Sequence, residues 1–127
     1  DGQQERAFSD IKFCLEPFEK LMFDYGGEVF NLGCPKQYPL NEVAEILVNI
    51  GKEFGYEPTI EHLEQRHGEA KYAYSNHDKA ENLLGFKDDT DLKESIREMF
   101  VWAMKQEDKE IKKMDYEIER GMYGYWK

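Results

Sequence analysis

Hydrophobic residues recur at helical spacing in several stretches of the chain. In residues 9–24 they lie three or four positions apart, which predicts a helix with Pro17 as a kink or a late start. Residues 39–54 carry the most regular stripe and predict a second helix. A short helix is expected over residues 77–84, capped by Asn76 and stopped by Gly85. Thr90 is placed to cap a longer helix that follows it.

Two other stretches have the character of strands. Residues 28–32 (EVFNL) form a β-branched and aromatic run that Gly33 and Pro35 close, which predicts a buried strand. Residues 59–63 (TIEHL) alternate like an exposed or edge strand, and residues 66–75 predict a loop. We find no repeat or dividing linker, so one domain is expected over residues 1–127. Its fold class is α/β, mostly helical with a few short strands. Residues 103–127 are expected to form a charged helical tail with an aromatic end.

Composition excludes several classes of function. The chain has 127 residues with a net charge of −10, which repels nucleic acid and anionic lipid. Its longest apolar run, Met99 to Met104, is far too short to span a membrane. Cys14 and Cys34 form no CxxC pair, and no secretory signal is visible. We therefore expect reduced thiols, no nucleic-acid or membrane partner, and a cytoplasmic location.

Common catalytic and cofactor motifs are missing from the sequence. It contains no GxGxxG, GxxxxGK or GxSxG, and His62, His67 and His77 lack the spacing of zinc ligands. Tyr123 and Lys127 have the Tyr-x-x-x-Lys spacing of some reductases. However, they flank Gly124 at the end of the chain, so we interpret this segment as an aromatic anchor. No catalytic, cofactor-binding or metal-ligating residue is therefore expected in this chain.

Three polar residues beside predicted elements could bind a ligand. Arg6 precedes the first helix, and Arg66 and Glu69 follow the 59–63 segment. Two guanidinium groups can bind a diphosphate bidentately, and a neighbouring carboxylate can accept hydrogen bonds from ribose hydroxyls. The alternative is that both arginines are exposed partners of surface carboxylates.

The order of five strings indicates a family. The strings follow one another in the order QxRxF, GEVFNLG, RHGE, YSNHDKAENLLGF and TDLKESIREMFVWA, and the match runs from about Gly2 to Trp102. Together they resemble the C-terminal portion of NAD-dependent nucleotide-sugar epimerases and dehydratases, which belong to the extended short-chain dehydrogenase/reductase family. The UDP-glucose 4-epimerase-like branch looks nearest.

The resemblance implies a role for six residues. Arg6 and Arg66 match the two arginines that bind the substrate diphosphate, and Phe8 matches an aromatic near the base and ribose. The other implied substrate-binding residues are Asn31 and Gly33, at a strand end that lines the nucleotide pocket, and Glu69, which would contact the ribose. The family motif RPGD reads RHGE here, so His67 replaces a rigid proline and Glu69 is one methylene longer than the usual Asp.

The same resemblance implies how the function is divided. In relatives, the glycine-rich NAD motif and the catalytic Tyr-x-x-x-Lys lie upstream of the matched portion. The chain is therefore expected to be the substrate-binding C-terminal part of a nucleotide-sugar epimerase or dehydratase, with a UDP-sugar as first choice. It would lack the Rossmann half, bind no cofactor and be inactive alone, whereas the full-length parent would use NAD. A non-catalytic sugar-nucleotide-binding or scaffold module is the alternative, and a degenerate remnant with plain surface arginines is a third.

Two partners follow from these expectations. One is the N-terminal NAD-binding half of the enzyme, because in relatives the strand matching residues 28–32 lies at the edge of the cofactor domain's sheet. The other is a second copy of the chain, which would pair through the same bare strand edge. The sequence leaves open the base, the sugar, the choice between epimerase and dehydratase, and whether the chain is a split subunit or a proteolytic product.

Overall fold

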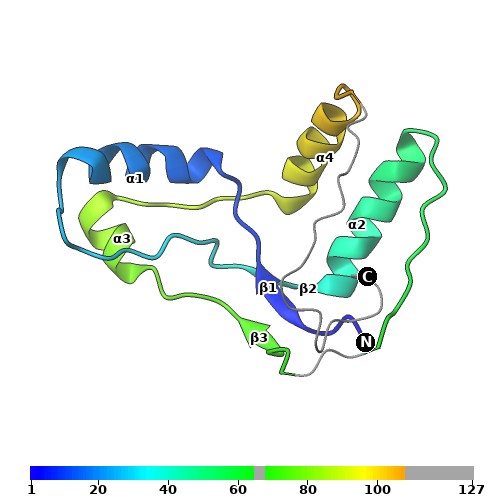
Figure 1. Ribbon diagram of the computed structural model, residues 1–127, viewed down its shortest axis with the longest axis horizontal. Coiled ribbons are helices and arrows are strands. Elements are labelled where there is room, and N and C mark those ends of the chain that lie inside the picture. Colours follow the sequence, from blue (N-terminus) through cyan, green and yellow to red (C-terminus); the bar gives the residue numbers. More distant parts are fainter. Residues whose placement is uncertain (65–67, 108–127) are drawn as a thin grey trace, which may run out of the picture.

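The computed structural model describes residues 1–64 and 68–107 and shows a small α/β fold (Figure 1). Within these residues, a three-stranded sheet lies between two groups of helices. The elements in chain order are β1 (Glu5–Ala7), α1 (Lys12–Phe23), β2 (Gln37–Pro39), α2 (Leu40–Glu53), β3 (Tyr72–Ala73), α3 (Asp78–Leu84) and α4 (Leu92–Ala103). The expected tail beyond residue 107, with Tyr123 and Lys127, lies outside the described residues.

The helix predictions are confirmed, with one correction to a cap. Pro17 lies buried inside α1, and Gly85 ends α3 in the left-handed conformation at a φ of 68°. The Asn76 side chain accepts a hydrogen bond of 3.1 Å from the amide of Asp78, as expected. Thr90 is not the cap of α4: Asp91 accepts the bond from the Glu94 amide at 3.1 Å. The Thr90 hydroxyl instead accepts a bond from the amide of Asp10, which places α4 against the start of α1.

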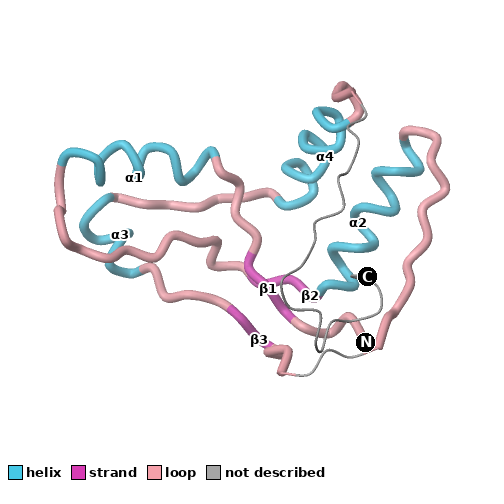
Figure 2. The backbone as a smooth tube through the Cα atoms, viewed as in Figure 1, coloured by secondary structure: helices cyan, strands magenta, loops and turns pink. Residues whose placement is uncertain are grey.

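Both strand predictions are wrong, because the sheet is built from other segments. β1 is the central strand, antiparallel to β2 and parallel to β3. Residues 28–32 and 59–63 form no ladder and lie in long loops (Figure 2). A β-branched or alternating run becomes a strand only when a neighbour pairs with it, and neither run has one among the described residues. β3 lies within the stretch predicted to be a loop.

Two hydrophobic clusters form the core. The first lies between the sheet, α2 and α4 and contains Tyr38, Val43, Ile50, Leu92 and Ile96. The second lies between α1, α3 and the 28–32 segment; its buried members are Ala80, Leu84 and Phe86, and Phe13, Leu21, Phe30 and Leu32 pack against them. The helices that contribute to the two clusters, α2 and α4 for the first and α1 and α3 for the second, lie on opposite sides of the sheet in Figure 1.

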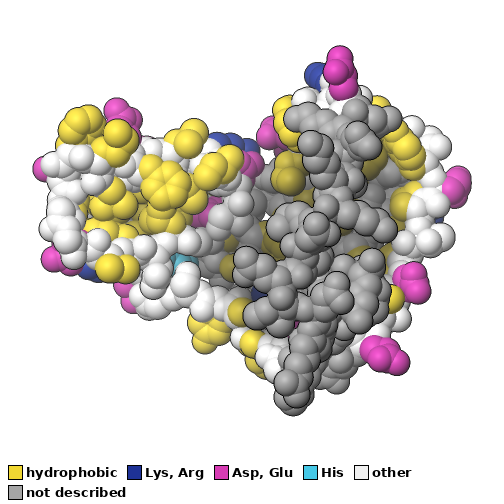
Figure 3. All heavy atoms as spheres, viewed as in Figure 1, with side chains coloured by type: hydrophobic (Ala, Val, Ile, Leu, Met, Phe, Trp, Pro, Cys, Tyr) yellow, Lys and Arg dark blue, Asp and Glu magenta, His cyan; other side chains and the backbone are white. Residues whose placement is uncertain are grey.

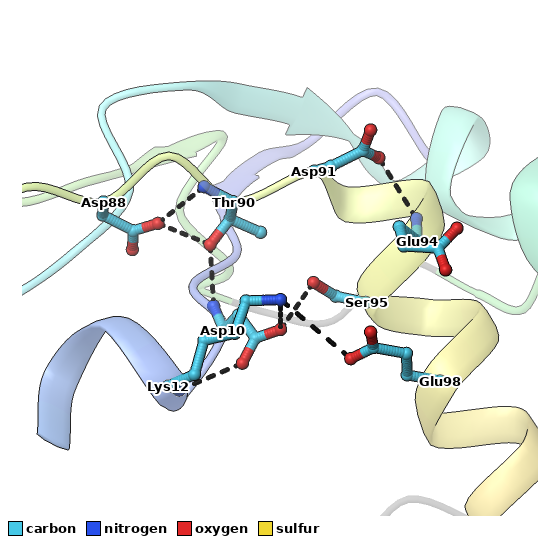
Figure 4. Close-up of polar contacts among 8 residues, drawn as sticks. All are labelled: Asp10, Lys12, Asp88, Thr90, Asp91, Glu94, Ser95 and Glu98. Carbon is cyan, nitrogen blue, oxygen red and sulfur yellow. Dashed lines mark hydrogen bonds and ion pairs between the residues drawn. The ribbon is translucent and has the colours of Figure 1, made fainter.

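A polar junction joins the two sides (Figure 4). The Asp10 carboxylate accepts hydrogen bonds from the Ser95 hydroxyl at 2.7 Å and from the Lys12 amide at 3.0 Å. The Asp10 amide donates to the Thr90 hydroxyl at 2.8 Å. The bond from the Lys12 amide, followed by the one from Ser95, lowers the pKa of Asp10 below its usual 3.8. The start of α1 is therefore fixed against the start of α4.

Candidate functional site

Arg6 connects the central strand to the segment that leads into β3. Its Nη1 donates to the carbonyl of Glu5 at 2.7 Å, and its Nη2 donates to the carbonyl of Ala70 at 2.9 Å. The parallel pairing of Arg6 with Ala73 brings these distant residues together. Nη1 also donates to the carbonyl of Lys71 at 3.5 Å. A guanidinium has five N–H donors, so these three bonds leave two for another acceptor.

Glu69 lies beside the same guanidinium. Its Oε1 is 3.8 Å from Arg6 Nη2, and the two side chains are 26% and 27% exposed, respectively. An ion pair that is this exposed is screened by water and contributes only about 0–1 kcal/mol. The structure thus brings together two of the residues that the sequence nominated, with their charged groups still accessible.

The other nominated residues lie in three different places. The Asn31 side chain donates to the Asn76 carbonyl at 3.2 Å. Gly33 lies so close to Ser75 that an added Cβ would come within 3.1 Å of its hydroxyl. Phe8 packs against the first hydrophobic cluster. Arg66 lies outside the described residues.

One short segment, residues 69–76, connects most of these contacts. Arg6 binds a carbonyl near its beginning, and Asn31 and Gly33 contact its end. β3 lies in the middle of the segment and is fixed by its pairing with β1. The segment therefore links Arg6 and Glu69 at its beginning to Asn31 and Gly33 near its end, and the candidate site is built along it.

A pocket of about 390 Å³ opens next to Glu69. The residues that line it include the acidic Asp1, Glu61, Glu64 and Glu69 and the basic Lys71, and Arg6 is not among them. Such a lining repels phosphate but offers acceptors to hydroxyl groups. The pocket therefore suits a neutral, hydroxyl-bearing group better than an anion.

Asn41 and His62, which sequence reasoning did not nominate, contact each other in the wall of this pocket. Asn41 Oδ1 lies 3.1 Å from His62 Nε2, and Asn41 Nδ2 donates to the carbonyl of Asp1 at 3.0 Å. These residues come from the start of α2 and from the loop after it. Neither stands in a recognisable motif, so no local signal could have identified the contact.

Neither a glycine-rich helix start nor a cluster of metal ligands is found in the part of the chain that the structure describes. None of the four described helices begins at a glycine-rich turn, the feature that brings amides close to a pyrophosphate. Over residues 1–64 and 68–107, no group of three His, Cys, Asp or Glu side chains could hold a metal. In the same part of the chain, no helix has the length and hydropathy needed to cross a bilayer.

The outward face of α1 is apolar and exposed. Ile11, just before the helix, and Leu15, Phe18 and Met22 line this face with exposures of 64%, 59%, 50% and 77%. Together with the inward-facing residues, these positions give α1 an apolar arc of about 200°, roughly twice what a one-sided helix needs. Figure 3 shows apolar side chains gathered over this part of the molecule.

Comparison with known proteins gives low-identity relatives. No family model matches the chain. A putative UDP-glucose 4-epimerase from Methanocaldococcus jannaschii is 29% identical over 80% of the chain, and a GDP-mannose 3,5-epimerase from Arabidopsis thaliana is 27% identical over 87%. The chain covers 32% and 28% of those proteins, about a third of their length.

A solved structure supports the fold. The structure of RMD from Pseudomonas aeruginosa complexed with NADPH superposes on this chain with a TM-score of 0.60 and a sequence identity of 22%. The superposition covers 76% of this chain and 31% of the RMD chain. This likeness concerns the fold alone. The two sequence relatives confirm that the chain resembles the nucleotide-sugar epimerases of the extended short-chain dehydrogenase/reductase family, and the solved structure shares its fold over this part.

Proposed function

We propose that this chain is the substrate-binding C-terminal part of a nucleotide-sugar epimerase or dehydratase and that it binds the nucleotide diphosphate of the substrate. One observation carries the proposal: Arg6 and Glu69 converge at the beginning of the 69–76 segment. Asn31 donates a hydrogen bond to the end of the same segment, and Gly33 lies beside that end. The two epimerase relatives supply the substrate class, a UDP-sugar or a related nucleotide sugar.

The chemistry of these residues suits such a ligand. The free donors of Arg6 can make charge-assisted hydrogen bonds to phosphate oxygens, and Arg66 is proposed as the second arginine of the diphosphate site. Glu69 and the acidic pocket beside it can accept hydrogen bonds from ribose or sugar hydroxyls. The diphosphate is thus expected on the Arg6 side of the segment, with hydroxyl groups toward the pocket.

The redox step would belong to a partner. NAD would supply hydride transfer when bound to the N-terminal half of the parent enzyme, whereas this chain binds and orients the substrate. We propose that the NAD-binding half covers the outward face of α1 and the adjacent 28–32 segment. Val29 in that segment is 79% exposed, and we find no backbone hydrogen bond from the Phe30 or Leu32 amide within the described residues. A partner strand would satisfy these groups, and a second copy of the chain is the alternative occupant.

Titration calorimetry with UDP-glucose and GDP-mannose tests the binding. The informative variant is Arg6→Lys, which keeps the charge but loses the bidentate geometry. We expect the affinity of the better ligand to fall about tenfold or more, since hydrogen bonds between charged groups contribute about 1.5–3 kcal/mol. Arg97→Lys is the matched control, because Arg97 lies on α4 and pairs with Glu53. Equal binding by both variants, or no binding by the wild type, contradicts the proposal.

Activity measurements separate the enzyme part from a binding module. If the chain is part of an enzyme, adding the NAD-binding half of a relative restores epimerisation or dehydration of the bound sugar nucleotide. A non-catalytic sugar-nucleotide-binding or scaffold module would bind the ligand and remain inactive in every mixture. Thermal unfolding of each variant must be recorded as well, because Arg6 also holds the Ala70 carbonyl.

A further inference from the structure

Glu69 lies where an anionic ligand would approach Arg6. We propose that Glu69 is a built-in counter-ion of Arg6, which a diphosphate must displace before it can use the guanidinium. This inference rests on the proposed function but concerns selectivity. Glu69 would discriminate against anions that have no hydroxyl groups to donate to the displaced carboxylate.

The geometry fixes one member of the pair and leaves the other able to move. Carbonyls of Glu5 and Ala70 hold the guanidinium at 2.7 and 2.9 Å. Glu69 Oε1 is 3.8 Å from Nη2, which is too long for a hydrogen bond but close enough for attraction between the charges. An incoming phosphate can therefore replace the carboxylate without moving Arg6.

The surroundings explain why Glu69 stays beside Arg6 when no ligand is bound. Glu69 shares the wall of the pocket with Asp1, Glu61 and Glu64. A carboxylate that moves away from Arg6 along that wall approaches like charges, which disfavours the displaced position. Lys71 lines the same pocket and offers the displaced group a partial substitute for Arg6.

Ligands differ in the hydrogen-bond donors that they offer to the displaced carboxylate. A sugar nucleotide carries hydroxyl groups that can donate to Glu69 while its phosphates bind Arg6. Inorganic pyrophosphate carries the charge without the sugar hydroxyls, so it offers the displaced Glu69 carboxylate no hydroxyl donors in place of Arg6. The counter-ion therefore weakens binding of the bare anion more than binding of the nucleotide sugar.

The test compares pyrophosphate and UDP-glucose binding to the wild-type 127-residue chain and to Glu69→Gln by calorimetry. Removing the competing charge should tighten pyrophosphate binding about two- to fivefold, the range measured for partly exposed ion pairs. UDP-glucose should gain less or lose affinity, so its preference over pyrophosphate falls. Glu61→Gln removes the same charge from the pocket wall and should change pyrophosphate binding by less than half as much.

The outcomes separate this inference from the proposed function. If the wild type binds UDP-glucose and Glu69→Gln binds pyrophosphate no more tightly, the counter-ion role is wrong and the substrate site stands. If neither protein binds either ligand, both proposals fall. Should Glu69→Gln fold poorly by circular dichroism, Glu69→Asp replaces it: the shorter side chain retreats from Arg6, so a smaller gain for pyrophosphate is expected, and no gain again refutes the role.

Discussion

Replacing Asp10 with asparagine tests how the two hydrophobic clusters are held together. The Asp10 carboxylate lies at the start of α1, where it accepts bonds from the Ser95 hydroxyl of α4 and from the Lys12 amide. Lys12 Nζ also lies 3.0 Å from its Oδ2. Asparagine keeps the size of the side chain but removes the charge and one acceptor, so the variant isolates the electrostatic part of this junction.

The expected cost can be worked out contact by contact. A hydrogen bond to a charged acceptor contributes about 1.5–3 kcal/mol, and asparagine can retain one of the two bonds in weaker form. The ion pair adds less than about 1 kcal/mol, because the Lys12 side chain is half exposed. We therefore expect the free energy of unfolding to fall by about 2 kcal/mol, a large part of the 5–15 kcal/mol typical of a domain.

Urea denaturation followed by circular dichroism measures this difference, and its pH dependence provides a second check. The pKa of Asp10 is lowered in the folded chain, first by the bond from the Lys12 amide and then by the bond from Ser95. Its contribution is therefore complete above the unfolded pKa near 3.8 and is lost as the pH falls through the lower folded value. The gap between wild type and Asp10→Asn should be constant near pH 7 and close at strongly acidic pH.

Asp89→Asn is the matched control. Asp89 also pairs with a lysine, Lys87, at 2.6 Å, but its side chain is 61% exposed. Its removal should change the free energy of unfolding by no more than about 0.5 kcal/mol. If Asp10→Asn costs no more than Asp89→Asn at pH 7, or if its deficit persists unchanged in acid, the junction does not work as described.

Three further predictions concern the core, a helix end and the outward face of α1. Ile50→Ala, at the fully buried centre of the first cluster, should lower the free energy of unfolding in urea by about 2–5 kcal/mol, whereas Leu47→Ala on the same helix should cost less than half of that. Gly85→Ala should lower the melting temperature through a loss of about 1–2 kcal/mol, because φ is 68° there, and Gly26→Ala should have little effect. Phe18→Gln should leave the free energy of unfolding in urea within about 0.5 kcal/mol of wild type. The same variant should associate more weakly with an NAD-binding half in analytical ultracentrifugation. A large loss of stability would show that this face of α1 is packed in the isolated chain.

The sequence analysis succeeded where structure is local. The apolar spacing of residues 39–54 and the Asn76 and Gly85 signals describe contacts within a few positions, and α2 and α3 follow them. The strands could not be found in this way. β1 pairs with segments far along the chain, and neither β2 nor β3 has a run long enough to show a period. The 28–32 run has strand-forming residues but no neighbour within the described residues.

Only part of the candidate site could be predicted from the sequence. Arg6 and Glu69 were nominated because of the strings around them, and their approach to 3.8 Å depends on β3, which the sequence did not predict. Phe8 was nominated through the family resemblance; its side chain packs against the first hydrophobic cluster, and its role in binding stays a prediction. The role of Arg66 stays a prediction.

The pairing of β1 with β3 also has a consequence for the order of folding. The Arg6 guanidinium and its acceptor on Ala70 are separated by 64 positions along the chain. At a synthesis rate of about 5–20 residues per second, the acceptor leaves the ribosome roughly 3 to 13 seconds after the arginine. Throughout that interval the guanidinium stays hydrated, so the bond between Arg6 and Ala70 can form only after the residues of α1 and α2 have been synthesised.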